Sequence, residues 1–322
     1  MSSSRTSRRA VLTATIATGA LLLTGCGGDS GDSAAAEGSD TRQVTDATGR
    51  KVQVPAAPQK VVALSEPTLD ASLALGIEPI GTTAGRGQSG VSSYLADKAG
   101  KAEVVATVAE ADMEKLAALQ PDLILLDETT AVKGEVAKLQ AIAPTVVTAK
   151  LNEDWTNAFT ATADALNKKA RATELLDGFE ADVASTTKRL GSNAGAVVSV
   201  IRWQNGAPSV VGRGVGHVGA TLTALGLDRP KDQQGTGTGH SEPVSLEKLS
   251  TIDGDWLFFG ALGDKAVGEQ AYEEAREVPN FGRLKAEQQG QVVVIDGSAW
   301  NSAGGPLAAR VVLDDVTKAL VS

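Results

Sequence analysis

A glycine-rich turn is the feature of this sequence that most resembles a chemical site. Residues 214–219 read GVGHVG, the pattern G-x-G-x-x-G, after an apolar run and before a helical pattern. Such a turn can hold the pyrophosphate of a dinucleotide at a helix N-terminus, with an acidic residue at the end of the next strand, about 20 residues on. Here that place falls in the polar loop at residues 231–237. We therefore interpret the glycines as allowing a loop to turn closely beside a cleft.

Metal-ligating and nucleophilic side chains are scarce. His217 and His240 each stand alone in a glycine-rich loop, with no carboxylate at a fixed spacing. The single cysteine, Cys26, allows neither an intramolecular disulfide nor a cysteine metal cage. No acid–base pair or nucleophile elbow stands out. We therefore predict no metal site, no cofactor and no enzymatic activity.

Two acidic residues recur at matched positions in a stretch that occurs twice. Residues 113–126 read MEKLAALQPDLILL and residues 246–259 read LEKLSTIDGDWLFF. In each copy, apolar residues three apart predict a short helix, and the apolar run that follows is typical of a strand buried in a parallel sheet. Glu114 and Glu247 fall in the first helical turn, where an acid interacts favourably with the helix dipole. The dipole does not explain why the acid recurs in both copies.

The elements that flank these stretches also occur twice. Asp112 and Ser245 stand where a helix N-cap belongs. The sequences LGI at residues 75–77 and LGL at residues 225–227 each close a helical pattern before a proline, as a glycine C-cap does. Landmarks in the same order indicate two lobes built on one plan. Because ligands favour the carboxyl ends of parallel strands and domain interfaces, we expect the site between the lobes.

A long helical region separates the two copies. Residues 155–190 contain no proline and one glycine, and the pattern predicts helices over residues 155–166 and 169–190. The second helix would be roughly 33 Å long, so we interpret it as the rigid connector of the lobes. The predicted division of the chain is a lipoprotein signal peptide at 1–26, a flexible tether with a small hairpin at 27–55, a first lobe at 56–154, the connecting helix region at 155–190 and a second lobe at 191–322.

The N-terminus is typical of an exported lipoprotein. Three arginines within residues 5–9 precede an apolar run at residues 10–23, which is too short to span a bilayer. The sequence LTGC ending at Cys26 resembles the bacterial lipobox, whose cysteine is lipidated, and SRR at residues 7–9 resembles a twin-arginine signal. We predict an extracytoplasmic protein anchored to the cell membrane. Its net charge of −9 argues against nucleic acid as a partner.

These features together resemble the iron-siderophore and cobalamin class of bacterial ABC-transporter substrate-binding proteins. The resemblance covers residues 55–322 and the lipobox, and its landmarks are KVVAL at 60–64, LGI at 75–77, the stretch from Glu114 to Ile124, the long helix, and Trp300 with GGP at 304–306. It implies an α/β fold of class III, in which two Rossmann-like lobes are joined by a single long rigid helix. It also implies that Glu114 and Glu247 dock onto arginines of the membrane permease.

The ligand implied by the resemblance is a ferric siderophore, captured outside the membrane and delivered to the permease. Because a chelator already surrounds the iron, the protein needs hydrogen-bond donors and apolar walls rather than metal ligands. Arginine and tryptophan serve those needs in the loops that we predict at residues 84–93, 202–206 and 297–302. The residues that we expect to face the cleft are Arg86, Arg202, Trp203 and Trp300, with Tyr94 and Arg213 as further candidates.

We predict a siderophore of the hydroxamate type. Haem and cobalamin stay open as ligands, and so many arginines would also suit anionic carboxylate or catecholate chelates. The expected partners are the ferric siderophore, an ABC permease with its ATPase, and the membrane through the lipid anchor, and we expect a monomer. The alternative from another class is a lipid-anchored, nucleotide-dependent α/β oxidoreductase that uses the turn at Gly214.

Overall fold

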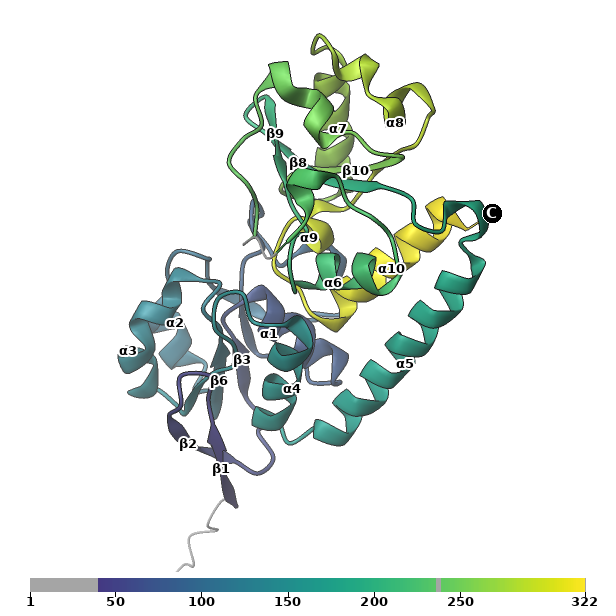
Figure 1. Ribbon diagram of the computed structural model, residues 1–322. Helices are drawn as coiled ribbons and strands as arrows, with labels where there is room; N and C mark the ends of the chain where they lie inside the picture. Colours follow the sequence, from purple (N-terminus) through teal and green to yellow (C-terminus); the bar gives the residue numbers. More distant parts are fainter. Residues whose placement is uncertain (1–39, 236–238, 322) are drawn as a thin grey trace, which may run out of the picture. The chain divides into compact units, whose positions relative to one another are not determined.

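The computed structural model describes residues 40–235 and 239–321 (Figure 1), so the predicted signal peptide and Cys26 lie outside the described residues. A small antiparallel hairpin comes first, formed by β1 (Thr41–Thr45) and β2 (Lys51–Pro55). Within the described ranges, no helix is both long enough and apolar enough to cross a membrane.

The first lobe contains a five-stranded parallel sheet of order β5-β4-β3-β6-β7. Its strands are β3 (Val61–Ala63), β4 (Gly81–Thr83), β5 (Glu103–Ala106), β6 (Leu123–Leu126) and β7 (Thr145–Val147). Its helices are α1 (Glu66–Ala74), the 3-10 helix η1 (Ser93–Leu95), α2 (Met113–Ala118), η2 (Ala131–Glu135) and α3 (Val136–Gln140). Residues of β6 are fully buried, as the apolar run predicts.

The second lobe contains a four-stranded sheet of order β11-β10-β8-β9, in which only β9 is antiparallel to its neighbour. Its strands are β8 (Val198–Gln204), β9 (Ala207–Val210), β10 (Trp256–Gly260) and β11 (Val292–Val294). Its helices are η3 (Gly191–Asn193), α6 (His217–Ala224), η4 (Lys231–Gln233), η5 (Leu246–Ile252), α7 (Lys265–Arg276), η6 (Phe281–Arg283), α8 (Lys285–Gln288), α9 (Gly297–Trp300) and α10 (Pro306–Leu320).

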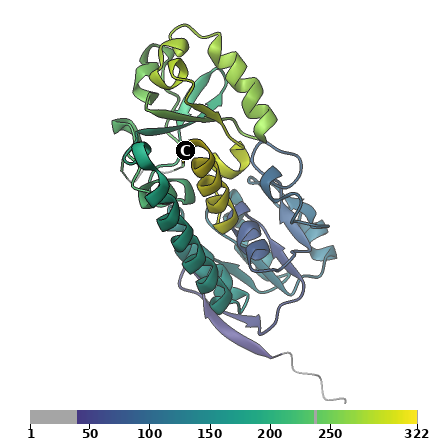
Figure 2. The same cartoon turned by 90° about the vertical axis from the view of Figure 1, so that its right-hand side faces the viewer.

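The predicted helical connection between the lobes is confirmed. After α4 (Trp155–Ala165), the 21-residue helix α5 (Lys169–Arg189) runs from one sheet to the other (Figures 1 and 2). Ala172, near its start, packs into a core cluster of the first lobe, whereas Phe179 and Val183 pack into one of the second lobe. A continuous helix that packs on both lobes agrees with the predicted two-lobed α/β fold.

The repeated stretch is helical in both copies, but the two helices differ. Asp112 caps α2 by accepting from the amide of Lys115 at 3.0 Å, and the second copy forms η5, a 3-10 helix with non-helical backbone at Lys248. Serine and threonine replace two alanines there, and the Thr251 hydroxyl bonds the Lys248 carbonyl at 2.9 Å. Such a bond competes with α-helical hydrogen bonding.

Two of the predicted loops are wrong in detail. Residues 202–204 belong to β8, because Asn205 and Gly206 both have positive φ and make a two-residue hairpin turn to β9. Residues 297–300 form α9, whose first turn is capped by Asp296, which accepts from the amide of Ser298 at 2.8 Å. A four-residue helix is too short to leave a periodic signal in the sequence.

Candidate ligand-binding site

A cavity of about 940 Å³ lies between the two lobes, at the carboxyl ends of their strands. The first lobe contributes residues that follow β4, β6 and β7, and the second contributes residues at the end of β8 and residues that follow β9 and β10. This is where α/β sheets usually bind ligands. The arginines that line the cavity are Arg86, Arg202 and Arg213, and the tryptophans are Trp155 and Trp300.

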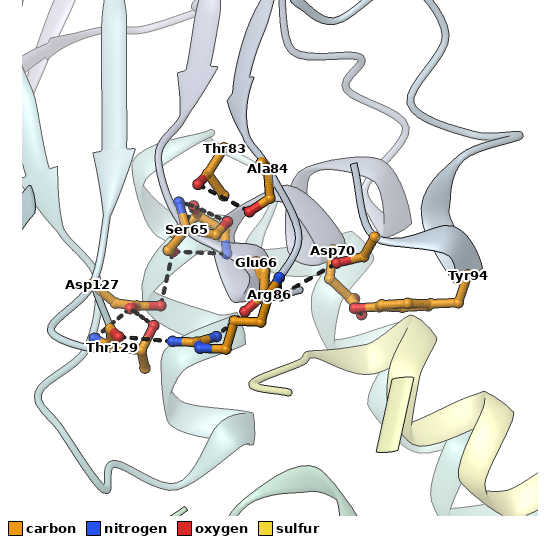
Figure 3. Close-up of polar contacts among 11 residues, drawn as sticks. Ser65, Glu66, Asp70, Thr83, Ala84, Arg86, Tyr94, Asp127 and Thr129 are labelled. Carbon is orange, nitrogen blue, oxygen red and sulfur yellow. Dashed lines mark hydrogen bonds and ion pairs between the residues drawn. The ribbon is translucent and has the colours of Figure 1, made fainter. Parts of the chain in front are cut away.

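Arg86 is held by a carboxylate of its own lobe (Figure 3). Its amide donates to Glu66 at 2.9 Å, its guanidinium forms an ion pair with the same carboxylate, and a second guanidinium nitrogen donates to the Thr129 carbonyl at 2.8 Å. The side chain of Glu66 is 1% exposed and that of Arg86 is 22% exposed. The charge of Arg86 is therefore balanced before any ligand arrives.

A second buried carboxylate, Asp127, stands beside this pair. It follows β6 directly and accepts from the Ser65 hydroxyl at 2.9 Å and from the Thr129 amide at 2.8 Å. Burial raises the pKa of Asp127 above its ordinary value, although these hydrogen bonds and the charge of Arg86 lower it. Burial likewise lowers the pKa of Arg86, and the charge of Asp127 raises it. The first-lobe wall is thus a self-contained polar network.

The second-lobe wall carries guanidinium groups that are not balanced in this way. Arg202, in β8, is 6% exposed, and its Nε has no hydrogen-bond partner among residues 40–235 and 239–321. Burial lowers the pKa of Arg202, and the charge of Arg86 from the other lobe lowers it further. The Nε of Arg213 is also buried without a partner in the described part of the chain. Arg202 is buried and Arg213 is half-buried, and within the described residues neither Nε has a partner, so both guanidinium groups favour a ligand that brings negative charge.

Arg229 adds to the positive charge behind this wall. It donates to the Gly212 carbonyl at 2.6 Å, to the Val211 carbonyl at 3.0 Å and to the side chain of Gln233 at 2.7 Å. Burial and the charge of Arg213 lower the pKa of Arg229 to about 10. Arg229 therefore fixes the loop that carries Arg213 without lining the cavity.

The predicted aromatic residues do not converge as expected. Trp300 lines the cavity and stacks on Phe258 with ring centroids 4.7 Å apart. Trp203 instead lies in the apolar core of the second lobe, 5.9 Å from Phe259, and is not a lining residue. Side chains alternate along a strand, so Arg202 and Gln204 face the cavity while Trp203 faces away.

Tyr94 also does not line the cavity, and its hydroxyl donates to Asp70 at 2.9 Å (Figure 3). Conversely, Trp155 lines the cavity although the sequence interpretation assigned it to the connecting region. Its amide donates across the lobes to the Val215 carbonyl at 3.3 Å. Asp127 was also missed, and its position directly after a buried strand is the signal that would have found it.

The glycine-rich turn lines the cavity through Gly214, Gly216 and Gly219 and leads into α6. A Cβ at Gly219 would lie 2.5 Å from the Gly214 carbonyl oxygen, so glycine lets the helix pack on its own loop. This agrees with a close turn beside the cleft. Among the described residues, no group of three or more histidine, cysteine, aspartate or glutamate side chains could hold a metal ion.

The buried imidazole of His217 makes stability depend on pH. Its Nε2 lies 2.7 Å from the Ala299 carbonyl, and burial lowers the pKa of His217 from 6.5 to about 4, with that hydrogen bond raising it in part. The unfolded chain therefore binds a proton at higher pH than the folded protein does. The stabilisation is fully present above about pH 6.5 and is lost as the pH falls toward 4.

We expect His217→Gln to remove this dependence, which amounts to about 3 kcal/mol between pH 7 and pH 4. Urea unfolding of the wild type and the variant at both pH values measures the difference. His240→Gln is the matched control, because His240 is exposed and should leave the wild-type dependence unchanged. An identical loss of stability in wild type and His217→Gln would contradict the assignment.

The two acidic residues of the repeated stretch, Glu114 and Glu247, are both exposed. Each stands in the first turn of its helix, and neither takes part in the cavity. They are therefore available to a partner on the outside of each lobe.

A family model described as periplasmic binding protein matches residues 61–299. The chain is 30% identical over 304 residues to the probable siderophore-binding lipoprotein YfiY of Bacillus subtilis (strain 168), covering 92% of this chain and 93% of that protein. It is 27% identical over 305 residues to the Fe(3+)-citrate-binding protein YfmC of the same organism, covering 92% of each. The crystal structure of Staphylococcus aureus SirA complexed with staphyloferrin B matches with a TM-score of 0.72 at 22% identity, over 87% of this chain and 98% of that chain.

Proposed function

Because this chain belongs to the periplasmic binding protein family, we propose that it captures a ferric siderophore between its lobes and delivers it to an ABC importer. It is a substrate-binding protein and not an enzyme. The observation that carries the proposal is a cavity lined by guanidinium groups from both lobes and by two tryptophans, Trp155 and Trp300. The names of two relatives, one siderophore-binding and one Fe(3+)-citrate-binding, support the ligand class.

The arginines of the second-lobe wall bear on the type of chelate. From the sequence we predicted a hydroxamate, but a ferric trihydroxamate carries no net charge and would not neutralise Arg202 and Arg213. Charge-assisted hydrogen bonds from arginine to an anionic oxygen are the stronger kind. We therefore favour a chelate that carries net negative charge and binds the iron through carboxylate groups. Ferric citrate is the simplest probe of this class. The hydroxamate stays as the competing outcome.

A thermal-shift titration tests both levels of the proposal. Ferric citrate, a ferric trihydroxamate, a ferric catecholate, haem, cobalamin and a nicotinamide dinucleotide are each added to the protein, because a ligand that binds only the folded state raises the melting temperature. We expect a ferric chelate to give the largest shift. A rise in melting temperature with haem or cobalamin alone would contradict the siderophore proposal. A rise with the dinucleotide alone would support the oxidoreductase alternative instead.

Glu114 and Glu247 are proposed as the residues that dock onto the permease. Exposed ion pairs contribute only about 0.2–1 kcal/mol each, so they orient the complex more than they hold it. We expect Glu114→Ala with Glu247→Ala to leave chelate affinity unchanged and to reduce iron uptake in cells. Glu78→Ala with Glu277→Ala is the matched control, because both residues are exposed at the opposite ends of the sheets. Normal uptake by the first double variant would rule out this docking role.

Cys26 is proposed as the lipid-anchored residue, which places the protein outside the cytoplasm at the cell membrane. We expect Cys26→Ala to move the protein from the membrane fraction to the soluble fraction while its thermal unfolding stays unchanged. Cell fractionation followed by immunoblotting measures the distribution. A variant that stays with the membranes as the wild type does would show that the anchor lies elsewhere.

A further inference from the structure

The helix α10 has no side-chain cap of its own. Its N-cap residue is Gly305 and its first residue is Pro306, so no side chain of the segment caps the helix. The amides of Leu307 and Ala308 belong to the group that an α-helix leaves without an internal partner. Asp70, from α1 of the first lobe, accepts both of them, each at 2.9 Å. A carboxylate of the first lobe thus caps the N-terminus of a helix in the second lobe, a role that usually belongs to the N-cap side chain of the helix itself.

The surroundings of Asp70 are built for this contact. Asp70 is fully buried, and the hydroxyl of Tyr94 donates to it at 2.9 Å (Figure 3). Burial raises the pKa of Asp70 to about 6, and the two amides and Tyr94 lower it in part, so the group is ionised at neutral pH. A Cβ at Gly305 would lie 2.9 Å from the Asp70 Oδ1, so glycine lets the carboxylate approach. The negative charge then faces the positive end of the α10 dipole.

A second set of contacts joins the same two regions. The hydroxyl of Ser93 lies 2.8 Å from that of Ser298 and donates to Asp296 at 3.1 Å, and the Tyr94 amide donates to Ser298 at 3.3 Å. Leu307, at the start of α10, packs against the first-lobe apolar cluster that contains Leu69 and Leu95. Both ends of the segment between α9 and α10 are therefore attached to the first lobe.

This segment is also part of the cavity wall, because residues 300–304 line it. We propose that Asp70 is a positioning residue, which ties the segment between α9 and α10 to the first lobe and thereby fixes the spacing of the lobes. The wall at residues 300–304 then keeps its place relative to the first lobe, and the second lobe keeps one spacing from it. This proposal does not depend on which ligand the cavity takes.

The distance between the lobes in the ligand-free protein tests the proposal. Spin labels are placed on Ala137→Cys in α3 and Gln270→Cys in α7, two exposed positions, in a Cys26→Ala background, and the distance distribution is measured by DEER. Asp70→Asn keeps the shape but removes the charge and sets an NH₂ group against amide donors. We expect the distribution to broaden about twofold, because the lobes then sample more than one spacing.

Asp264→Asn is the matched control. Asp264 caps α7 within the second lobe, accepting from the Val267 amide at 3.0 Å, so the same substitution removes the charge of a helix cap without touching the contact between the lobes. We expect this variant to keep the narrow distribution. An unchanged distribution in Asp70→Asn, or equal broadening in Asp264→Asn, would overturn the proposal.

A milder variant covers the case in which Asp70→Asn does not fold. Tyr94→Phe with Ser298→Ala keeps Asp70 and both of its amide bonds but removes one hydroxyl from each set of contacts. We expect a smaller broadening than in Asp70→Asn, with circular dichroism unchanged. A folded double variant with the wild-type distribution would show that these contacts do not set the spacing of the lobes.

Discussion

Arg86→Met is expected to lower the free energy of unfolding by about 3–5 kcal/mol, the cost of leaving a buried charge without its partner. Glu66 would lose its ion-pair partner, and Asp127 would lose the positive charge beside it. Both losses are costly because each carboxylate is only 1% exposed. Methionine keeps much of the length of arginine, so the effect reports charge and hydrogen bonding rather than a cavity. Urea unfolding at pH 7 measures it.

The second cavity arginine provides the control. Arg202→Met removes a buried guanidinium whose Nε has no partner within the described residues, and no ion pair of those residues includes it. We expect its stability to stay within about 1 kcal/mol of wild type, because no partner is left unpaired. Glu66→Gln should restore part of the loss in an Arg86→Met background. Equal effects of the two methionine variants would show that Arg86 is not the partner on which Glu66 depends.

Arg202→Ala combined with Arg213→Ala should weaken binding of an anionic ferric chelate by about a hundredfold or more. Hydrogen bonds to charged groups contribute about 1.5–3 kcal/mol each, and the two guanidiniums are on the same wall of the cavity. Isothermal titration with ferric citrate measures the change in dissociation constant. A ferric trihydroxamate should be affected much less, because it carries no net charge.

Arg283→Ala is the control for this pair, because Arg283 is exposed in η6 and does not line the cavity. We expect it to bind ferric citrate as the wild type does. Equal affinity of the double variant and the wild type for ferric citrate would contradict the proposed anion site. If the wild type bound only the trihydroxamate tightly and the double variant did not bind it, the result would support the hydroxamate prediction.

The fold could be predicted because its main signals are local and periodic. Residues 155–190 lack proline, and the structure divides them into α4 and α5 at Asn167, which has positive φ. The helices predicted over residues 155–166 and 169–190 begin where α4 and α5 begin, and each of these ends one residue earlier than predicted. Glycines at 76 and 226 have positive φ, as the predicted C-caps require. Each of these features depends on neighbours within a few positions.

The site was less predictable because its contacts are not local. Nearly every residue of β8 is buried, so alternation of polar and apolar residues could not show that Arg202 and Trp203 face opposite sides. Glu66 and Arg86 are 20 residues apart with no periodic relation, and only the side-by-side placement of β3 and β4 brings them together. The sequence therefore identified Arg86 as a cavity residue but not the carboxylate that neutralises it.

The contact between Asp70 and α10 also affects when the protein can complete its fold. Asp70 and Ala308 are 238 positions apart in the chain. Contacts of such large sequence separation form late, because the entropy of closing a long loop opposes them until other structure is in place. The helix α10 thus receives its cap from α1, a helix that is synthesised more than two hundred residues earlier. The cavity wall at residues 300–304 is therefore fixed to the first lobe only after α10 has been synthesised.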